Sequence, residues 1–242
     1  MMRSLWVLAA LPLVACGTID EAKGEKVAGT GAGSSRTFQV ADFTGVELAG
    51  FDDVDVTVGP AFSVRADGRS EDLDKLDIRK DGSTLHVGRR KGDGWGWGKD
   101  GKGVTVRVTM PAIALASLAG SGNLKVDKVS GGDFRGELAG SGDLSVGQLA
   151  ANSAKLDIAG SGGIRAAGQV RALSVSIAGS GDVDAKGLRA DSADISIAGS
   201  GNVTADVTGD ASIDLMGSGD VTLGQGARCK INKMGSGEVR CG

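Results

Sequence analysis

Hydrophobic and polar residues alternate over much of the chain, most clearly in its second half. In the stretch Ser174-Val175-Ser176-Ile177, for example, every second side chain is apolar. A period of two is typical of a β-strand that buries one face, whereas a helix repeats about every 3.6 residues. Glycine-containing corners interrupt the alternation at regular distances. The pattern therefore predicts successive pairs of β-strands joined by corners, rather than helices.

The corners share a Gly-Ser-Gly motif that occurs seven times, at intervals of 18 to 20 residues. Residues three and five positions from each serine are almost always apolar, as Leu118 and Leu124 are around the first one. A fixed period of about 20 residues is typical of repeat proteins, in which stacked units share a core that no single unit could bury alone. We therefore predict an all-β fold, a parallel β-solenoid, and we call each of its turns a rung. The corner serines are Ser121, Ser141, Ser161, Ser180, Ser200, Ser218 and Ser236.

A polar column is expected two positions after the serines. Asparagine and aspartate side chains commonly bond to nearby backbone in turns, so we interpret this column as structural. A calcium-binding ladder is the alternative, although it would favour an unbroken run of acids and a shorter repeat. The column comprises Asn123, Asp143, Gly163, Asp182, Asn202, Asp220 and Glu238.

The solenoid domain is predicted to span residues 37–242, with an N-terminal capping part at 37–110 and a repeat part at 111–242. Within the cap, the segment from Leu48 to Val56 matches the repeat pattern with Phe51 in the place of the serine, which predicts a degenerate first rung. Four further strand-like stretches and one short helical turn near residues 70–75 follow. An open stack needs caps of this kind because its edges would otherwise pair with other chains.

The first residues have the pattern of a secretory leader. A short apolar run over residues 5–15 follows Arg3 and is too short to span a membrane. It ends in Leu13-Val14-Ala15-Cys16, which resembles a bacterial lipobox. We therefore predict a lipoprotein signal peptide at 1–15, lipidation of Cys16, and a flexible tether over 16–36. An ordinary signal peptide with a chance cysteine is the alternative. Because Gly17 rather than aspartate follows the cysteine, the resemblance implies anchoring in the outer membrane, facing the periplasm or the surface.

Two further cysteines fall in the last repeat. Cys229 lies seven positions before Ser236 and Cys241 five positions after it, and both offsets hold inward residues in other rungs. A secreted protein meets an oxidising compartment, so we predict a Cys229–Cys241 disulfide. Two buried free thiols are the alternative.

Few residues are suited to catalysis. The chain has one histidine and a formal charge of −3, and an acidic balance argues against nucleic-acid binding. A serine nucleophile needs a base within hydrogen-bond reach, but His86 lies before the repeats, at an outward position of a predicted strand. The outward columns carry no recurring acidic pair of the kind that polysaccharide-cleaving enzymes need. We therefore expect no catalytic residues, no metal site and no cofactor.

One unusual loop spans residues 89–103. It places Trp95 and Trp97 among glycines and basic residues, so we expect it to be exposed to solvent. Exposed aromatic rings can stack on sugars or lie at a membrane interface. The loop is therefore a candidate binding surface, and an ordinary hairpin connection is the alternative.

The unit (Leu/Ile)-Ala-Gly-Ser-Gly-(Asp/Asn)-(Val/Leu), the degenerate first rung and Pro111 before the repeats resemble the family of putative auto-transporter adhesins with a head GIN domain. The resemblance covers residues 37–242. It implies a right-handed β-helix-like fold and a place in the bacterial envelope, and it brings no catalytic residues. The chain departs from the simplest members in its tryptophan loop, in Met216 and Met234 where alanine is usual, and in Lys233 where a branched residue is usual.

Together these observations predict a non-catalytic cell-envelope lipoprotein that presents a β-solenoid surface for adhesion or another envelope interaction. A polysaccharide-active enzyme on a β-helix scaffold and a purely structural envelope component stay open as alternatives. The expected partners are the membrane, through the lipid anchor, and an envelope glycan or protein whose identity the sequence does not give. The sequence does not set the oligomeric state either.

Overall fold

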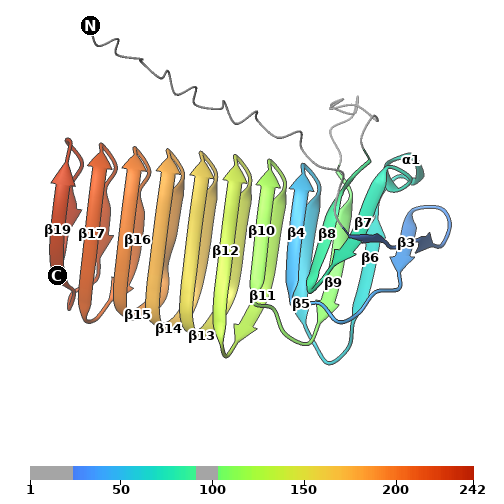
Figure 1. Ribbon diagram of the computed structural model, residues 1–242, viewed down its shortest axis with the longest axis horizontal. Coiled ribbons are helices and arrows are strands. Elements are labelled where there is room, and N and C mark those ends of the chain that lie inside the picture. The colour runs from blue at the N-terminus through green and yellow to red at the C-terminus, as the bar shows by residue number, and fades with distance from the viewer. Residues whose placement is uncertain (1–23, 91–102) are drawn as a thin grey trace, which may run out of the picture.

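The alternating stretches form β-strands that stack into a parallel β-solenoid, so the predicted fold class is confirmed (Figure 1). The computed structural model describes residues 24–90 and 103–242. Strands β13, β14 and β15 each run from one corner to the next around the far side of the coil. The strands of the repeat part are β10 (Leu115–Gly120), β11 (Asn123–Ser130), β12 (Asp133–Gly140), β13 (Asp143–Gly160), β14 (Gly163–Gly179), β15 (Asp182–Gly199), β16 (Val203–Val207), β17 (Asp210–Gly217), β18 (Val221–Leu223), β19 (Arg228–Met234) and β20 (Val239–Arg240).

Equivalent repeat positions lie directly above one another. Leu118 of β10 pairs with Leu138 of β12, which pairs with Ile158 of β13. The spacing between corners varies, yet this register is kept because the irregularities fall on the side of the coil away from the corners. Register shifts occur there between residues 146 and 149, 165 and 167, and 185 and 189. The corners therefore form a straight edge, and the return bends absorb the variation in repeat length.

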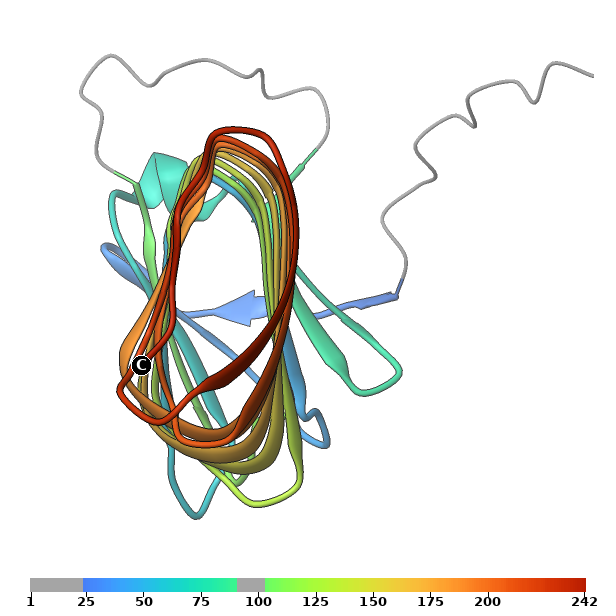
Figure 2. The ribbon, with the colours of Figure 1, turned by 90° about the vertical axis from the view of Figure 1, so that its left-hand side faces the viewer.

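The coil is elongated in cross-section, as the end view shows (Figure 2), and the apolar columns form its buried core. Leu118, Leu124 and Ile213 have no exposed surface. The last rung differs: Ile231, which the pattern placed inside, is 44% exposed. That expectation is wrong because burial here needs a further rung on top, and no described residue covers the last one.

Glycine is required at the corners for two separate reasons. Gly120 has φ of +142°, which favours glycine over other residues, and an added Cβ would overlap the carbonyl oxygen of Gly50 in the neighbouring rung. At Gly122 φ is not positive, but a Cβ would overlap the carbonyl oxygen of Asp52. The motif thus reflects close approach between rungs as well as backbone conformation.

The predicted degenerate rung is confirmed: β4 (Gly45–Gly50) pairs with β10 and β5 (Asp53–Val58) pairs with β11. One more parallel layer lies beyond it, in which β8 (Thr84–Arg89) pairs with β4 and β9 (Thr105–Met110) pairs with β5. Antiparallel strands then end the stack, because β6 (Ser63–Asp67) pairs with β9 and β7 (Leu76–Asp81) with β8. The short helix α1 (Ser70–Leu73) connects these two strands and matches the predicted helical turn.

The segment before the cap departs from the predicted tether over 16–36. β1 (Glu25–Lys26) pairs with β7, β2 (Gly29–Thr30) pairs with β3 (Ser35–Phe38), and β3 pairs with β6. The tether interpretation is therefore wrong for these strand residues. The side chains of β1 and β2 are exposed, so no apolar pattern signals them, and their pairing rests on backbone hydrogen bonds to open strand edges. The predicted leader and Cys16 lie outside the described residues.

Candidate functional site

The seven corner serines line one exposed edge of the solenoid. Their backbone groups connect the rungs: the Ser121 amide donates to the Gly50 carbonyl and the Ser141 amide to the Gly120 carbonyl, each at 2.9 Å. The hydroxyl oxygens of Ser218 and Ser236 lie 3.1 Å apart. The imidazole of His86 lies on β8, with Nδ1 3.2 Å from Oε2 of Glu47. The contacts of these serines thus support a structural role at the corner.

The polar column after the serines bonds between rungs, which corrects the expectation of bonds within each turn. The amide of Asn202 donates to Oδ1 of Asp182 at 2.9 Å, and the amide of Asp220 donates to Oδ1 of Asn202 at 2.9 Å. The amide of Glu238 donates to Oδ1 of Asp220 at 2.8 Å. Stacking brings the amide of the next rung within hydrogen-bond distance of each of these oxygens. Within residues 24–90 and 103–242, no group of three or more His, Cys, Asp or Glu side chains is arranged to hold a metal ion.

The outermost parallel layer has an insertion where other rungs have a corner. Leu48 pairs with Val87 and Asp53 pairs with Thr105, so residues 49–52 of the degenerate rung correspond to residues 88–104 of that layer. Trp95 and Trp97 belong to this insertion, and both lie outside the described residues. The described ends of this insertion therefore stand where the repeats have a corner, at the edge that the serines occupy.

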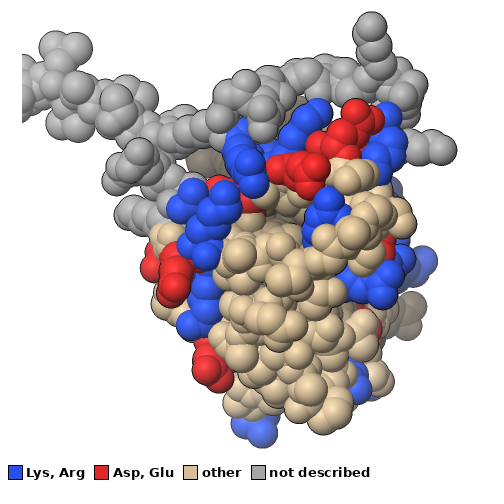
Figure 3. Space-filling view, turned by 90° about the vertical axis from the view of Figure 1, so that its right-hand side faces the viewer, with Lys and Arg blue, Asp and Glu red and all other residues tan. Residues whose placement is uncertain are grey.

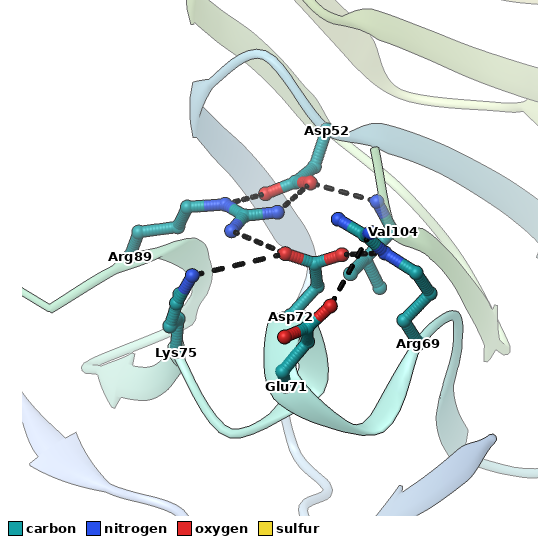
Figure 4. Close-up of polar contacts among 7 residues, drawn as sticks. All are labelled: Asp52, Arg69, Glu71, Asp72, Lys75, Arg89 and Val104. Atoms are coloured by element: carbon teal, nitrogen blue, oxygen red, sulfur yellow. Dashed lines mark hydrogen bonds and ion pairs between the residues drawn. The ribbon is translucent and has the colours of Figure 1, made fainter. Parts of the chain in front are cut away.

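The two ends of this insertion bind the same buried carboxylate, that of Asp52 (Figure 4). Arg89, at the end of β8, donates from Nε to Oδ2 at 2.8 Å and from Nη2 to Oδ1 at 2.6 Å. The backbone amide of Val104, just before β9, donates to Oδ1 at 2.8 Å. The side chain of Asp52 has no exposed surface. Charge-assisted bonds of this two-pronged kind are strong and directional, so Asp52 fixes where the chain leaves and re-enters the solenoid.

A second carboxylate supports Arg89 from the helix. In Asp72 of α1, Oδ1 lies 3.9 Å from Nη1 of Arg89 and 4.0 Å from Nζ of Lys75. The other oxygen, Oδ2, lies 2.7 Å from Nε of Arg69. Hydrogen bonding to Asp52 raises the pKa of the Arg89 guanidinium above its ordinary value; burial acts in the opposite direction, and the charges of Asp52 and Asp72 add to the increase. Arg89 is therefore a permanent cation held between two carboxylates.

An exposed aromatic ring completes the base of the insertion. The guanidinium carbon of Arg89 lies 4.4 Å from the centre of the Phe51 ring, and Phe51 is 44% exposed. Guanidinium groups at this distance are attracted to the ring face. Figure 3 shows charged side chains along the upper rim and down both sides of this end of the rod, while the middle of the same face is mostly uncharged. The described base of the insertion thus presents both an apolar ring and fixed charge.

Sequence reasoning identified the tryptophan loop but missed Asp52. The available signal was its position: Gly50-Phe51-Asp52 stands where the repeats have Gly-Ser-Gly, so Asp52 replaces a glycine that the other corners need. At the opposite end of the rod, the structure joins Cys229 and Cys241 as a disulfide with Cα atoms 6.3 Å apart. That distance meets the requirement of about 7 Å or less for a bridge.

Comparisons with known proteins agree with this architecture. A family model described as putative auto-transporter adhesin, head GIN domain, matches residues 42–227. No curated protein matches the sequence. None of the described helices is long and apolar enough to cross a membrane.

Several solved structures share the fold. A putative adhesin from Bacteroides fragilis has a TM-score of 0.78 and 18% identity, covering 86% of this chain and 95% of its own. A putative lipid binding protein from Parabacteroides distasonis has a TM-score of 0.66 and 21% identity, covering 88% of this chain and 98% of its own. A putative adhesin from Parabacteroides merdae has a TM-score of 0.65 and 16% identity, with the same two coverages. At these identities the likeness supports the fold alone.

Proposed function

Because the chain belongs to the family described as putative auto-transporter adhesin, head GIN domain, we propose that it is a non-catalytic adhesin of the bacterial cell envelope. Its binding element is the corner insertion at residues 88–104. Binding residues are concentrated in loops that a rigid scaffold positions, and this insertion is carried by two strands of a continuous parallel stack.

The observation that carries the proposal is the attachment of both ends of the insertion to Asp52. A buried carboxylate is unfavourable unless its hydrogen bonds are satisfied, and here Arg89 and Val104 supply three of them. An ordinary strand connection needs no such anchor. The arrangement therefore supports an insertion whose attachment points are fixed before any ligand binds, which reduces the entropy lost on binding.

The composition of the insertion indicates its ligand. Trp95 and Trp97 supply flat rings that can stack on sugars. Four basic residues supply cations for acidic groups and outnumber the two aspartates between them; they are Arg90, Lys91, Lys99 and Lys102. The ligand class we propose is an acidic glycan of the envelope. Lipidation at Cys16 is proposed to hold the protein at the outer membrane, and the Cys229–Cys241 disulfide is proposed to form in that oxidising environment.

The chain offers an internal probe for this proposal. It has three tryptophans and no tyrosine, and the third tryptophan, Trp6, falls in the predicted leader. After removal of the leader, the tryptophan fluorescence of the protein would come from the insertion alone. Titration with lipopolysaccharide-derived acidic polysaccharide should change this emission in a saturable way, whereas a neutral dextran of similar length should not.

The matched variants are Trp95→Ala/Trp97→Ala and, as a control at an exposed apolar residue of β17, Met216→Ala. We expect the double variant to bind the immobilised polysaccharide at least about tenfold more weakly, since aromatic residues carry a large share of binding energy at such sites. Met216→Ala should bind like the unchanged protein. Equal binding by all three proteins would disprove the role of the insertion, and binding to phospholipid vesicles instead of polysaccharide would disprove the proposed ligand class.

A further inference from the structure

The last rung leaves one side of its main strand unpaired. β19 pairs with β17, and no other described strand pairs with it. In a parallel ladder, alternate residues direct their N–H and C=O groups to opposite neighbours. Because the amide of Arg228 donates to the Gly209 carbonyl at 2.9 Å, the backbone groups of Cys229, Ile231 and Lys233 point out of the end of the stack. These groups form a template for a further strand.

The core is also open at this end. Ile231 is 44% exposed, whereas Ile213, its partner in the rung below, has no exposed surface. Lys233 stands where the other rungs have leucine or isoleucine, and its ammonium group donates to the Gly237 carbonyl at 2.9 Å. A partner that continued the stack would therefore gain both backbone hydrogen bonds and apolar contact.

The charges of the last two rungs indicate which partner would fit. Residues 206–223 contain four aspartates and no lysine or arginine, whereas residues 224–242 contain four basic residues and one acidic residue, Glu238. The two rungs attract one another, as the 2.9 Å ion pair between Arg228 and Asp210 shows. Lys230 is exposed and contacts no acidic side chain among the described residues. The end of a chain of net charge −3 is thus locally basic.

We propose that this C-terminal edge, formed by Arg228–Met234 and Val239–Cys241, docks an extended segment of a partner protein in which apolar and acidic residues alternate. The segment adds as a further strand in the register that β17 and β19 have: its apolar side chains cover Ile231, and its acidic side chains lie over Arg228 and on either side of Lys230. Strand addition of this kind obtains affinity from backbone bonds and specificity from alternate side chains. A second copy of this chain fits less well, because it would place one basic edge against another.

The test uses a peptide that already has the required pattern, the sequence of β17 (Asp210–Gly217). In β17 itself, Ala211, Ile213 and Leu215 are buried and Asp210 and Asp214 are exposed. The labelled peptide is titrated with the full chain and followed by fluorescence anisotropy. We expect saturable binding that weakens as salt is added, and binding at least about tenfold weaker for a peptide carrying lysine in place of both aspartates.

Two protein variants locate the site. Lys230→Glu reverses a charge at the edge, and Lys186→Glu makes the same change at an exposed position of β15. Lys230→Glu should weaken peptide binding by about tenfold or more and Lys186→Glu should leave it unchanged, with equal melting temperatures showing that both variants are folded. Hydrogen exchange should show new protection at the amides of Cys229, Ile231 and Lys233.

Three results would overturn the proposal. They are the absence of saturable binding, equal affinity for the acidic and the lysine-containing peptides, and protection confined to other rungs. Light scattering provides a separate check on the occupant. If the full chain dimerises and Lys230→Glu abolishes the dimer, the edge binds a second copy rather than an acidic segment.

Discussion

The two ends of the solenoid limit further strand pairing in different ways. At the N-terminal end, β6 and β7 run antiparallel to the last parallel layer and cover it. At the C-terminal end, no described strand covers β19 and β20, and the core of this last described rung is partly exposed. A repeated stack does not limit its own length, so each end needs a separate device against uncontrolled pairing. One end uses a change of strand direction and a buried ion pair, and the other uses basic side chains and a disulfide.

The largest loss in the free energy of unfolding is expected at the N-terminal end, from Asp52→Ala. This change leaves Arg89 without its bidentate partner and Val104 without its acceptor, and removing one partner of a buried pair typically costs about 3–5 kcal/mol. Denaturant unfolding measures the loss. The matched control is Asp55→Ala, at an outward position of β5, for which we expect a change within about 0.5 kcal/mol.

A double variant separates the charge from the packing at this position. Without Asp52, Arg89 is a partly buried cation that has lost its bidentate partner. Combining Asp52→Ala with Arg89→Met removes this cation and should recover part of the lost free energy of unfolding. A loss below about 1 kcal/mol for Asp52→Ala would contradict the view that this carboxylate anchors the insertion.

The second largest loss of stability is expected at the C-terminal end, from removal of the disulfide. Replacing Cys229 and Cys241 together by serine removes a link between residues 12 apart in sequence, which corresponds to about 3 kcal/mol in the chain-entropy description. Because contacts in a repeat stack are local, we expect faster hydrogen exchange in β19 and β20 and little change in the inner rungs. Addition of a reductant to the unchanged protein should reproduce this pattern. Free thiols at both positions under non-reducing conditions would refute the bridge.

The sequence predicted the repeat part well because its signal is local and periodic. Leu118, Leu138 and Ile158 hold equivalent offsets from their serines, and that offset alone predicts both the buried face and the stacking partner. The cap has no such period. Nothing in the residues near Val87 or Thr105 states that they pair with Leu48 and Asp53, so the position of the insertion could not be derived.

The features that the sequence did not predict share one physical cause: each depends on residues that are distant in the sequence. Asp52 is buried only because Arg89 and Val104 reach it, and β1 forms only because β7 offers it a free edge. Ile231 is 44% exposed because no described strand covers it. For the candidate site, the sequence therefore indicated the two tryptophans that we propose as binding residues, but not the carboxylate that joins the two described ends of the insertion.

The smallest loss of stability is expected for Ile231→Ala. This substitution allows the end rung to be compared directly with an inner one. Ile213 and Ile231 are paired residues of the same type in adjacent rungs, one without exposed surface and the other 44% exposed. Ile213→Ala should cost about 2–5 kcal/mol because it opens a cavity in a covered core. Ile231→Ala should cost less than about 1 kcal/mol, since a side chain that is already solvated loses little apolar burial and leaves no closed cavity.

The β17 peptide sharpens the comparison. When it is bound, the difference in stability loss between the two variants should narrow, because the peptide would cover Ile231 as β19 covers Ile213. Equal losses for the two variants without peptide would mean that the last rung is already covered in solution, and that the two ends are more alike than the structure indicates.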